Sequence, residues 1–347
     1  MTATRPPGAA PRVAGRRRLP PAGLLALSAV LLVLACLASL ALGARQVGWS
    51  TLVDAWLDFD PTNGDHAVVA SRLPRTVVGV LVGAALGLAG AAMQGVARNP
   101  LADPGILGVN AGAALAVVVA MFAFGITSLT GYIWFAFLGA GVAAVVVYSV
   151  ASLGREGATP VKLVLAGAAL SAGLSSLMNG ILVSSQETLD GFRFWQIGSL
   201  SGRTWDVIVP VVPFIAVGVV VTLVTGRMLN GLALGDDVAR GLGQGVGLSR
   251  GVTAVGVVIL CGAATALAGP IMFVGLVIPH IARALVGTDY RWILPLAMVL
   301  APVLLISADV VGRLVLPPGE VQAGVLTALL GAPVFIWLVR RTRGAAL

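Results

Sequence analysis

The sequence predicts an all-α, polytopic membrane protein with ten transmembrane helices and both termini in the cytoplasm. Of its 347 residues, 58% are hydrophobic and 10% are charged, and the mean hydropathy is +0.99. A soluble domain carries about 25% charged residues, so a soluble fold is excluded. Several uncharged runs are long enough to cross a bilayer, which takes about 20 apolar residues. The basic residues set the orientation, because Lys and Arg collect on the cytoplasmic side.

The first helix follows an N-terminal extension, residues 1–21, that is rich in Pro, Gly and Arg. This composition predicts a disordered segment. The uncharged run at 19–44 is longer than the apolar core of a signal peptide, which has about 7–15 residues, so we expect an uncleaved transmembrane helix. Basic residues before this run hold the N-terminus in the cytoplasm. They are Arg5, Arg12, Arg16, Arg17 and Arg18.

Further uncharged runs give the other helices, and residues 22–347 form a single transmembrane domain. The run 104–154 is long enough for two helices, with a turn at 125–131. The run 251–282 fits either one long helix or two short helices interrupted at Gly269 and Pro270. In chain order the runs are 76–97, 104–154, 163–186, 207–226, 251–282, 292–308 and 321–339.

The positions of the charges decide how often the run 251–282 crosses the membrane. With two crossings, all but six of the 22 basic residues lie in cytoplasmic segments; with one crossing they divide almost evenly. The positive-inside rule therefore selects two crossings and ten helices in all. This topology explains the net charge of +8 without a nucleic acid partner. The six outer residues are Arg45, Arg72, Arg75, Arg193, Arg203 and Arg313.

The sequence lacks the motifs of an enzyme. Its only lysine, Lys162, is followed by Leu163, so there is no Walker A loop for ATP. Two cysteines in apolar runs and two histidines exclude a disulfide framework and a cysteine-rich metal site. The runs contain no Asp, Glu, Lys or Arg, the charges that ion-coupled carriers need within the membrane. We expect no catalytic or metal site, and energy from another subunit.

Two polar segments flank the second helix. R-L-P-R-T, residues 72–76, is placed just outside this helix, where its arginines form either a positive surface site or a pair of interfacial anchors. R-N-P-L-A-D-P-G, residues 98–105, predicts a sharp turn on the cytoplasmic side. Within it, Asp103 is placed to cap a helix that begins at Pro104.

A third polar segment is the cytoplasmic loop 227–250. It is either an ordinary solvated loop or contains a short helix that is capped by Asp236 or Asp237 and ends near Gly241. A short helix with apolar and charged sides is suited to docking into the groove of another protein. The lack of an energy source in this chain favours docking.

Four long motifs resemble those of one known family. The first is R-L-P-R-T-V-V-G-V-L-V-G-A-A-L-G-L-A-G-A-A-M-Q-G-V-A-R-N-P-L-A-D-P-G-I-L-G-V-N-A-G at 72–112. The others are G-P-I-M-F-V-G-L-V-I-P-H at 269–280, A-D-V-V-G-R at 308–313 and L-G-A-P-V-F-I-W-L at 330–338. They resemble the FecCD/BtuC-type permeases, the membrane subunits of ABC importers for iron-siderophores, haem and cobalamin. The resemblance covers residues 48–341.

The resemblance implies a ten-helix subunit of a type II ABC importer in the bacterial cytoplasmic membrane, with a short gating helix after the fifth span. Its expected partners are a second permease subunit, identical or homologous, two ABC ATPase subunits, an extracytoplasmic substrate-binding protein and membrane lipid. The chain itself would bind no cofactor, because ATP and Mg²⁺ belong to the ATPase chains.

The resemblance also assigns roles to residues at matching positions. Coupling to the ATPase falls to Asp236, Asp237, Val238, Ala239, Arg240, Gly241 and Leu242. Docking of the binding protein falls to Arg72, Arg75 and Arg313. The pathway and its gate fall to Asn179, Ser184, Ser185 and Gln186.

Ferric siderophore is the expected substrate, because it is the commonest substrate class of this family. Cobalamin or haem import by the same architecture is the alternative. An ion-coupled secondary transporter is a further alternative, which the uncharged runs disfavour.

Overall fold

The structure is a computed structural model that describes residues 20–154, 159–317 and 319–344. Residues 1–19 of the expected N-terminal extension therefore lie outside the described residues. The helices are α1 (Pro21–Ala41), α2 (Trp49–Leu57), α3 (Gly64–Ala97), the 3-10 helix η1 (Pro104–Leu107), α4 (Val109–Phe124), α5 (Leu129–Ala151), α6 (Pro160–Ser184), α7 (Gln186–Gln196), α8 (Trp205–Val224), α9 (Gly226–Ala233), α10 (Asp236–Gly241), α11 (Val246–Ala268), α12 (Val274–Val286), α13 (Tyr290–Val315) and α14 (Ala323–Gly344).

The described residues are all-helical, as predicted, and include helices that can cross a membrane. By length and composition, α1, α3, α5, α6, α8, α11 and α13 are long and apolar enough to span, and these are 7 helices. Shorter apolar helices are Val109–Phe124, Val274–Val286 and Ala323–Ile336. This set of apolar helices is that of a polytopic membrane protein.

The start of α3 differs from the sequence prediction. The apolar run begins at residue 76, but the helix begins at Gly64, where the side chain of Asn63 accepts a hydrogen bond from the amide of Asp65. A charge ends an apolar run without ending a helix, so Arg72 and Arg75 lie inside α3 and not outside it. They are carried on one rigid element with the membrane-spanning part.

The two longest apolar runs each form two helices. The run 104–154 contains α4 and α5, joined at residues 125–128, which confirms the predicted turn. Asp103 caps as predicted, accepting a hydrogen bond from the amide of Gly105 at 2.7 Å, but it caps η1, and α4 begins only at Val109. The run 251–282 is divided between α11 and α12. Helix α11 ends at Ala268, and its C-cap is Gly269, whose φ of 75° suits glycine.

The predicted loop 227–250 is largely helical. It holds α9, the short helix α10 and the start of α11. The short helix ends at Gly241 as predicted, but Gly235 stands at its N-cap, and Asp236 and Asp237 occupy its first turn. Acidic residues stabilise this position because the N-terminus of a helix carries partial positive charge.

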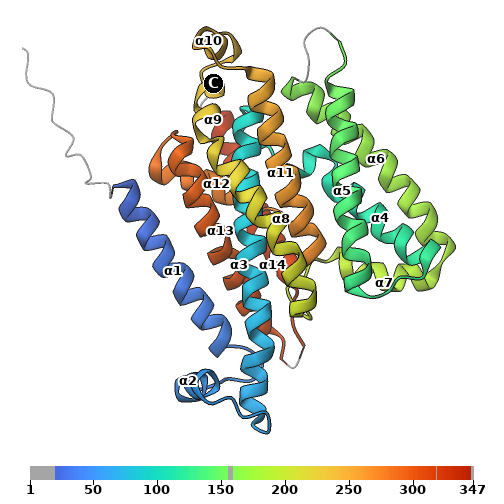
Figure 1. The fold of residues 1–347 in the computed structure, drawn as a ribbon, viewed down its shortest axis with the longest axis vertical. Helices are drawn as coiled ribbons and strands as arrows, with labels where there is room; N and C mark the ends of the chain where they lie inside the picture. The colour runs from blue at the N-terminus through green and yellow to red at the C-terminus, as the bar shows by residue number, and fades with distance from the viewer. Residues whose placement is uncertain (1–19, 155–158, 318, 345–347) are drawn as a thin grey trace, which may run out of the picture.

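Helix α3 is the centre of the bundle (Figure 1), with α8, α11, α12 and α13 packed around it. Glycines allow this close approach: a Cβ on Gly90 would overlap the carbonyl oxygen of Gly275, and one on Gly83 would lie 2.5 Å from Pro302 Cα. Rows of small residues let helix backbones approach each other in membranes. In Figure 1, α4, α5, α6 and α7 form a second group on one side, and α1 lies on the other.

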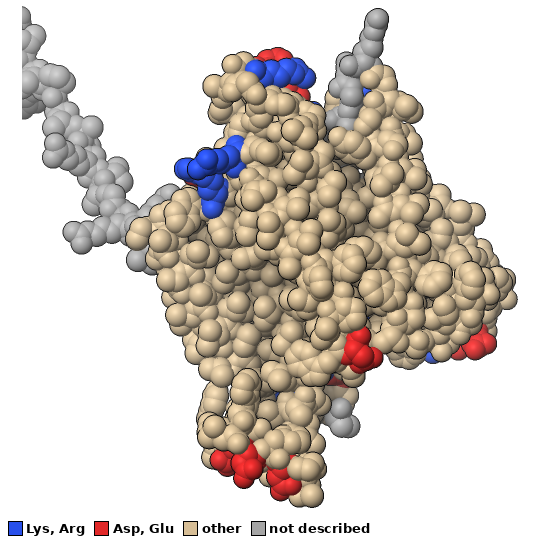
Figure 2. Space-filling model, in the orientation of Figure 1, with Lys and Arg blue, Asp and Glu red and all other residues tan. Residues whose placement is uncertain are grey.

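The two ends of the bundle carry different polar clusters. At the upper end in Figure 1 lie α9 and α10, and at the lower end lie α2 and the start of α3. On the face drawn in Figure 2, most visible Lys and Arg side chains lie toward the upper end and most Asp and Glu side chains toward the lower end. The surface between them is largely uncharged, which is the pattern of a protein held across a bilayer.

Candidate functional site

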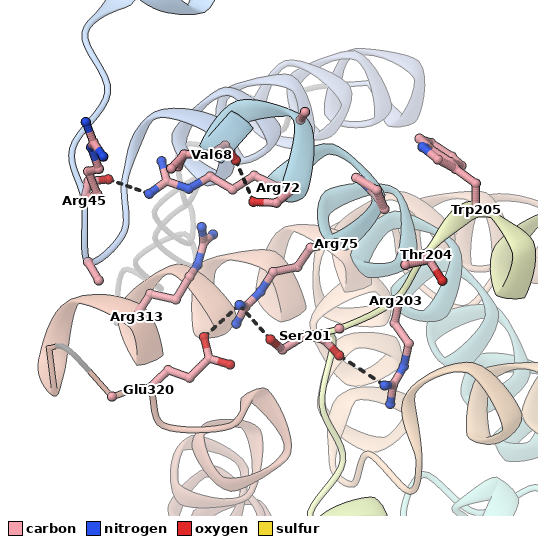
Figure 3. Close-up of a pocket in the computed structure, with 16 residues that line it drawn as sticks. Arg45, Val68, Arg72, Arg75, Ser201, Arg203, Thr204, Trp205, Arg313 and Glu320 are labelled. Atoms are coloured by element: carbon pink, nitrogen blue, oxygen red, sulfur yellow. Dashed lines mark hydrogen bonds and ion pairs between the residues drawn. The ribbon is translucent and has the colours of Figure 1, made fainter. Parts of the chain in front are cut away.

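A cavity of about 560 Å³ opens at the lower end of the bundle. It is formed where the start of α3, the segment after α7 and the segment before α14 meet. Figure 3 shows that charged side chains from all three lie around it. Its charged lining residues are Arg45, Arg72, Arg75, Arg203, Arg313 and Glu320. The site is therefore strongly basic.

Arg75 is the centre of this cluster. Its Nε and Nη2 donate to the carboxylate of Asp309 at 2.8–3.1 Å, and its Nη1 donates to Glu320 Oε2 at 2.7 Å. Nη1 also lies 3.3 Å from Ser201 Oγ. Hydrogen bonds between two charged groups are about twice as strong as neutral ones. One guanidinium therefore joins α3 to α13, to the segment after α7 and to the segment before α14.

Arg72 and Arg313 hold the end of α1. Arg72 donates to the carbonyl oxygens of Leu40 and Ala41 at 2.8 and 3.1 Å, and Arg313 donates to those of Ser39 and Leu42 at 3.0 Å. The last carbonyls of a helix have no partner within the helix and carry partial negative charge. The two arginines satisfy these carbonyls from α3 and from α13.

The sequence predicts one role for Arg72, Arg75 and Arg313, but in the structure these arginines have different partners. Arg72 and Arg313 are buried, at 7% and 5% exposure, and both are engaged with α1. Arg75 lines the cavity with one of its donor groups turned to a half-exposed carboxylate. Asp309, Ser201 and Glu320 also belong to this cluster and were not predicted from the sequence. Asp309 could have been found, because it lies four residues before Arg313 on a helix and pairs with it at 3.3 Å.

Arg203 gives the cavity another fixed wall. Its Nε donates to the carbonyl of Leu267 at the end of α11, and its Nη1 donates to the carbonyl of Ser201 at 3.1 Å. Burial lowers the pKa of this guanidinium, which nevertheless stays charged, since an arginine titrates far above neutral pH. It is not a free surface charge.

At the upper end of the bundle, helix α10 has a buried side and an exposed side. Asp236 faces inward, forms an ion pair with Arg98 at 3.1 Å and accepts a hydrogen bond from Arg250 at 3.0 Å. Ala239 is fully buried. The side chain of Asp237 is 99% exposed and pairs with Arg240 at 3.0 Å, while Val238 and Leu242 are exposed by 50% and 69%. Gly241 is also exposed.

This division assigns different tasks to the predicted coupling residues. The ion pairs of Asp236 anchor α10 to Arg98 at the end of α3 and to Arg250 near the start of α11. The outward residues include the exposed apolar Val238 and Leu242, and Leu234 and Leu248 close by in the chain are exposed as well. Exposed apolar patches of this kind are typical of protein interfaces.

A second network ties the segment before α13 to the same end. Asn230 on α9 donates to Asp289 at 2.7 Å and accepts from the amide of Tyr290 at 2.8 Å. The hydrogen bonds from Arg291 and Asn230 outweigh desolvation and lower the pKa of Asp289 well below its ordinary value. Arg283 on α12 donates to Gln94 on α3 at 3.0 Å. These bonds join α9 to the start of α13 and join α12 to α3 at the same end of the bundle.

The predicted pathway residues lie on an open face. Asn179, Ser184 and Gln186 are exposed, and Ser185 caps α7 by accepting a hydrogen bond from the amide of Thr188 at 3.3 Å. Of the most apolar part of α6, only 17% is buried. Among the described residues, no group of three or more His, Cys, Asp or Glu side chains could hold a metal ion.

Comparisons with known proteins match most of the chain. The profile of the FecCD transport family matches residues 31–341. The chain is 45% identical over 319 residues to a probable siderophore transport system permease protein, YfiZ, of Bacillus subtilis, covering 92% of this chain and 95% of that protein. It is 44% identical to the ferric enterobactin transport system permease protein FepD of Escherichia coli, covering 91% and 95%.

A solved structure has the same fold. It is described as an inward-facing conformation of a putative metal-chelate type ABC transporter, with a TM-score of 0.80 and 30% sequence identity. The match covers 92% of this chain and 99% of that one. The likeness therefore extends from the sequence motifs to the arrangement of the helices.

Proposed function

This chain belongs to the FecCD transport family, and from this premise we propose that it is the membrane subunit of an ATP-driven importer of ferric siderophores. Members of the family are permease subunits of ABC transporters and not enzymes. The chain is a multi-pass protein of the bacterial inner membrane. The observation that carries the substrate class is the near full-length identity of 45% and 44% to permeases named for siderophores.

The proposed assembly contains a second permease subunit, two ATPase subunits that bind ATP and Mg²⁺, and an extracytoplasmic binding protein. The open face of α6 supports a neighbouring subunit, because most of its apolar residues have no cover within the chain. The pathway would then run past Asn179, Ser184, Ser185 and Gln186. The exposed side of α10 supports a cytoplasmic partner, and the basic cavity supports an acidic partner outside.

We propose ten crossings with both termini in the cytoplasm, residues 22–347 forming the transmembrane domain. The seven long helices and the three shorter apolar ones supply this number. A phosphatase that is active only outside the cytoplasm, fused after Leu316, should give high activity, and the same fusion after Gly287 should give almost none. Equal activity of the two fusions would contradict this topology.

Within α10 we propose that Asp237, Val238, Arg240, Gly241 and Leu242 contact the ATPase, while Asp236 and Ala239 hold the helix in place. ATP-driven closure of the ATPase pair would push on α10. The push would reach α3 through Arg98 and α11 through Arg250, both paired with Asp236. A two-state rearrangement of packed helices would then alternate access to the pathway.

ATP-dependent uptake of a radiolabelled ferric siderophore tests the function. Cells that express the complete importer should accumulate the chelate, and the double variant Val238→Asp/Leu242→Asp should lose uptake at least about tenfold because charges disrupt an apolar contact. The matched control is Leu153→Asp, an exposed apolar residue at the same end, which should transport normally.

Two results would contradict this proposal. If the cells accumulate cobalamin or haem but no ferric siderophore, the proposed substrate class is wrong. If uptake continues without ATP but stops when the proton gradient is abolished, the proposed energy source, ATP, is wrong.

A further inference from the structure

Arg75 presents two sides of unequal accessibility. The side formed by Nε and Nη2 is paired with Asp309, whose side chain is 2% exposed. The side formed by Nη1 is paired with Glu320, whose side chain is 28% exposed and lines the cavity. The inner pair is closed to any partner, and the outer pair can be reached from outside.

Glu320 is an acidic residue in a basic cavity, where it accepts hydrogen bonds from Arg75 and from the side chain of Ser201. Of the described lining residues it is the one carboxylate, beside Arg45, Arg72, Arg75, Arg203 and Arg313. Burial by itself raises the pKa of Glu320, but the hydrogen bond and charge of Arg75 lower it below the ordinary value. The carboxylate is therefore ionised at neutral pH and neutralises part of an otherwise basic site.

The segment that carries Glu320 connects two functional helices. Glu320 lies three residues before α14, and the amide of Gly324 at the start of α14 donates to the carbonyl of Gly198 at 3.1 Å. Gly198 and Ser201 belong to the segment that follows α7. A bond between Arg75 and Glu320 thus restrains the junction at which α7 and α14 meet.

We propose that Glu320 occupies the place of a carboxylate of the extracytoplasmic binding protein, so that docking replaces one acid on Arg75 by another and releases the start of α14. This inference rests on the proposed function, which supplies the partner. The occupant is an acidic side chain, because the position already accepts a carboxylate oxygen 2.7 Å from Nη1. Arg72 and Arg313 donate to carbonyls of α1, so the exchange is proposed for Arg75, which holds Glu320 directly.

The test measures binding of the extracytoplasmic binding protein that supports uptake in the transport assay to the complete importer in lipid nanodiscs. Glu320→Gln keeps the size of the side chain and removes its charge. The carboxylate of the binding protein then competes with a neutral group, and not with a charged one, for Arg75. Affinity should rise about tenfold, the effect of one close charge pair at an interface. The matched control is Glu187→Gln, an exposed glutamate on α7, which should bind like the unaltered protein.

A second variant, Glu320→Asp, keeps the charge and shortens the side chain, so it weakens the internal pair without removing the acid. Affinity should rise by a smaller factor than in Glu320→Gln. If either variant binds the partner as well as the unaltered importer or less well, the exchange is wrong. If the unaltered importer does not bind the partner at all, the proposed function fails instead.

Discussion

Replacing Asp309 by asparagine will destabilise the protein by about 3–5 kcal/mol, the loss expected when one partner of a buried ion pair is removed. Asp309 is 2% exposed and is paired with both Arg75 and Arg313, whose side chains are 11% and 6% exposed. Asparagine keeps the shape of the side chain but leaves two buried guanidinium groups with one carboxylate, that of Glu320. Their remaining acceptors are neutral oxygens, those of Ser201 for Arg75 and of Ser39 and Leu42 for Arg313, which do not cancel the repulsion between the two charges.

The apparent melting temperature of the purified protein in detergent checks this result, and a fall of roughly 10 °C is expected. Asp190→Asn is the matched control, because Asp190 pairs with Arg193 in an exposed position where both side chains are about half accessible. Exposed ion pairs contribute about 0–1 kcal/mol. Equal melting of the two variants would show that water reaches the arginines around Asp309.

Gly90→Ala will separate α3 from α12 and abolish transport. A Cβ at this position would overlap the carbonyl oxygen of Gly275, and backbone cannot rotate away as a side chain can. Gln94 would also lose its hydrogen bonds with the carbonyl of Leu276 and with Arg283, now 3.2 and 3.0 Å long. We expect a loss of stability of about 3 kcal/mol, at the upper end of the usual cost of overpacking.

The measurement is again melting in detergent, combined with ferric siderophore uptake. Gly141→Ala is the control: Gly141 lies within α5, and a Cβ there meets no atom within 4 Å. Alanine should leave its stability unchanged or raise it by about 0.5–1 kcal/mol, since glycine weakens a helix interior. If Gly90→Ala behaves like Gly141→Ala, α3 and α12 are not held at this distance.

The sequence was most informative where physical chemistry acts on neighbouring residues. Apolar runs predicted the membrane helices, because a helix in lipid needs a continuous apolar surface. The same reasoning found the turn between α4 and α5 and the short helix α10. It misplaced the start of α3 because the charge of Arg75 ends the apolar run, whereas Asn63 caps the helix far earlier.

Partners distant in the chain could not be predicted in this way. The sequence grouped Arg72, Arg75 and Arg313 as outer charges, and nothing nearby indicates that two of them bind the end of α1. Glu320 had no local signal, because its pairing with Arg75 joins residues 245 positions apart. Single-sequence patterns report periodicity and turns, whereas such pairs depend on how whole helices pack.

The hold of Arg313 on α1 sets an order of assembly. Helix α1 is synthesised and inserted first, but the carbonyl of Ser39 must await a donor 274 residues further along the chain. Only 22% of the most apolar part of α1 is buried, so little else fixes it sideways in the meantime. Arg72 on α3 reaches the carbonyls of Leu40 and Ala41 soon after α1 is made, and Arg313 on α13 reaches those of Ser39 and Leu42 much later. The end of α1 is thus secured in two steps, the second of which needs the ninth apolar segment.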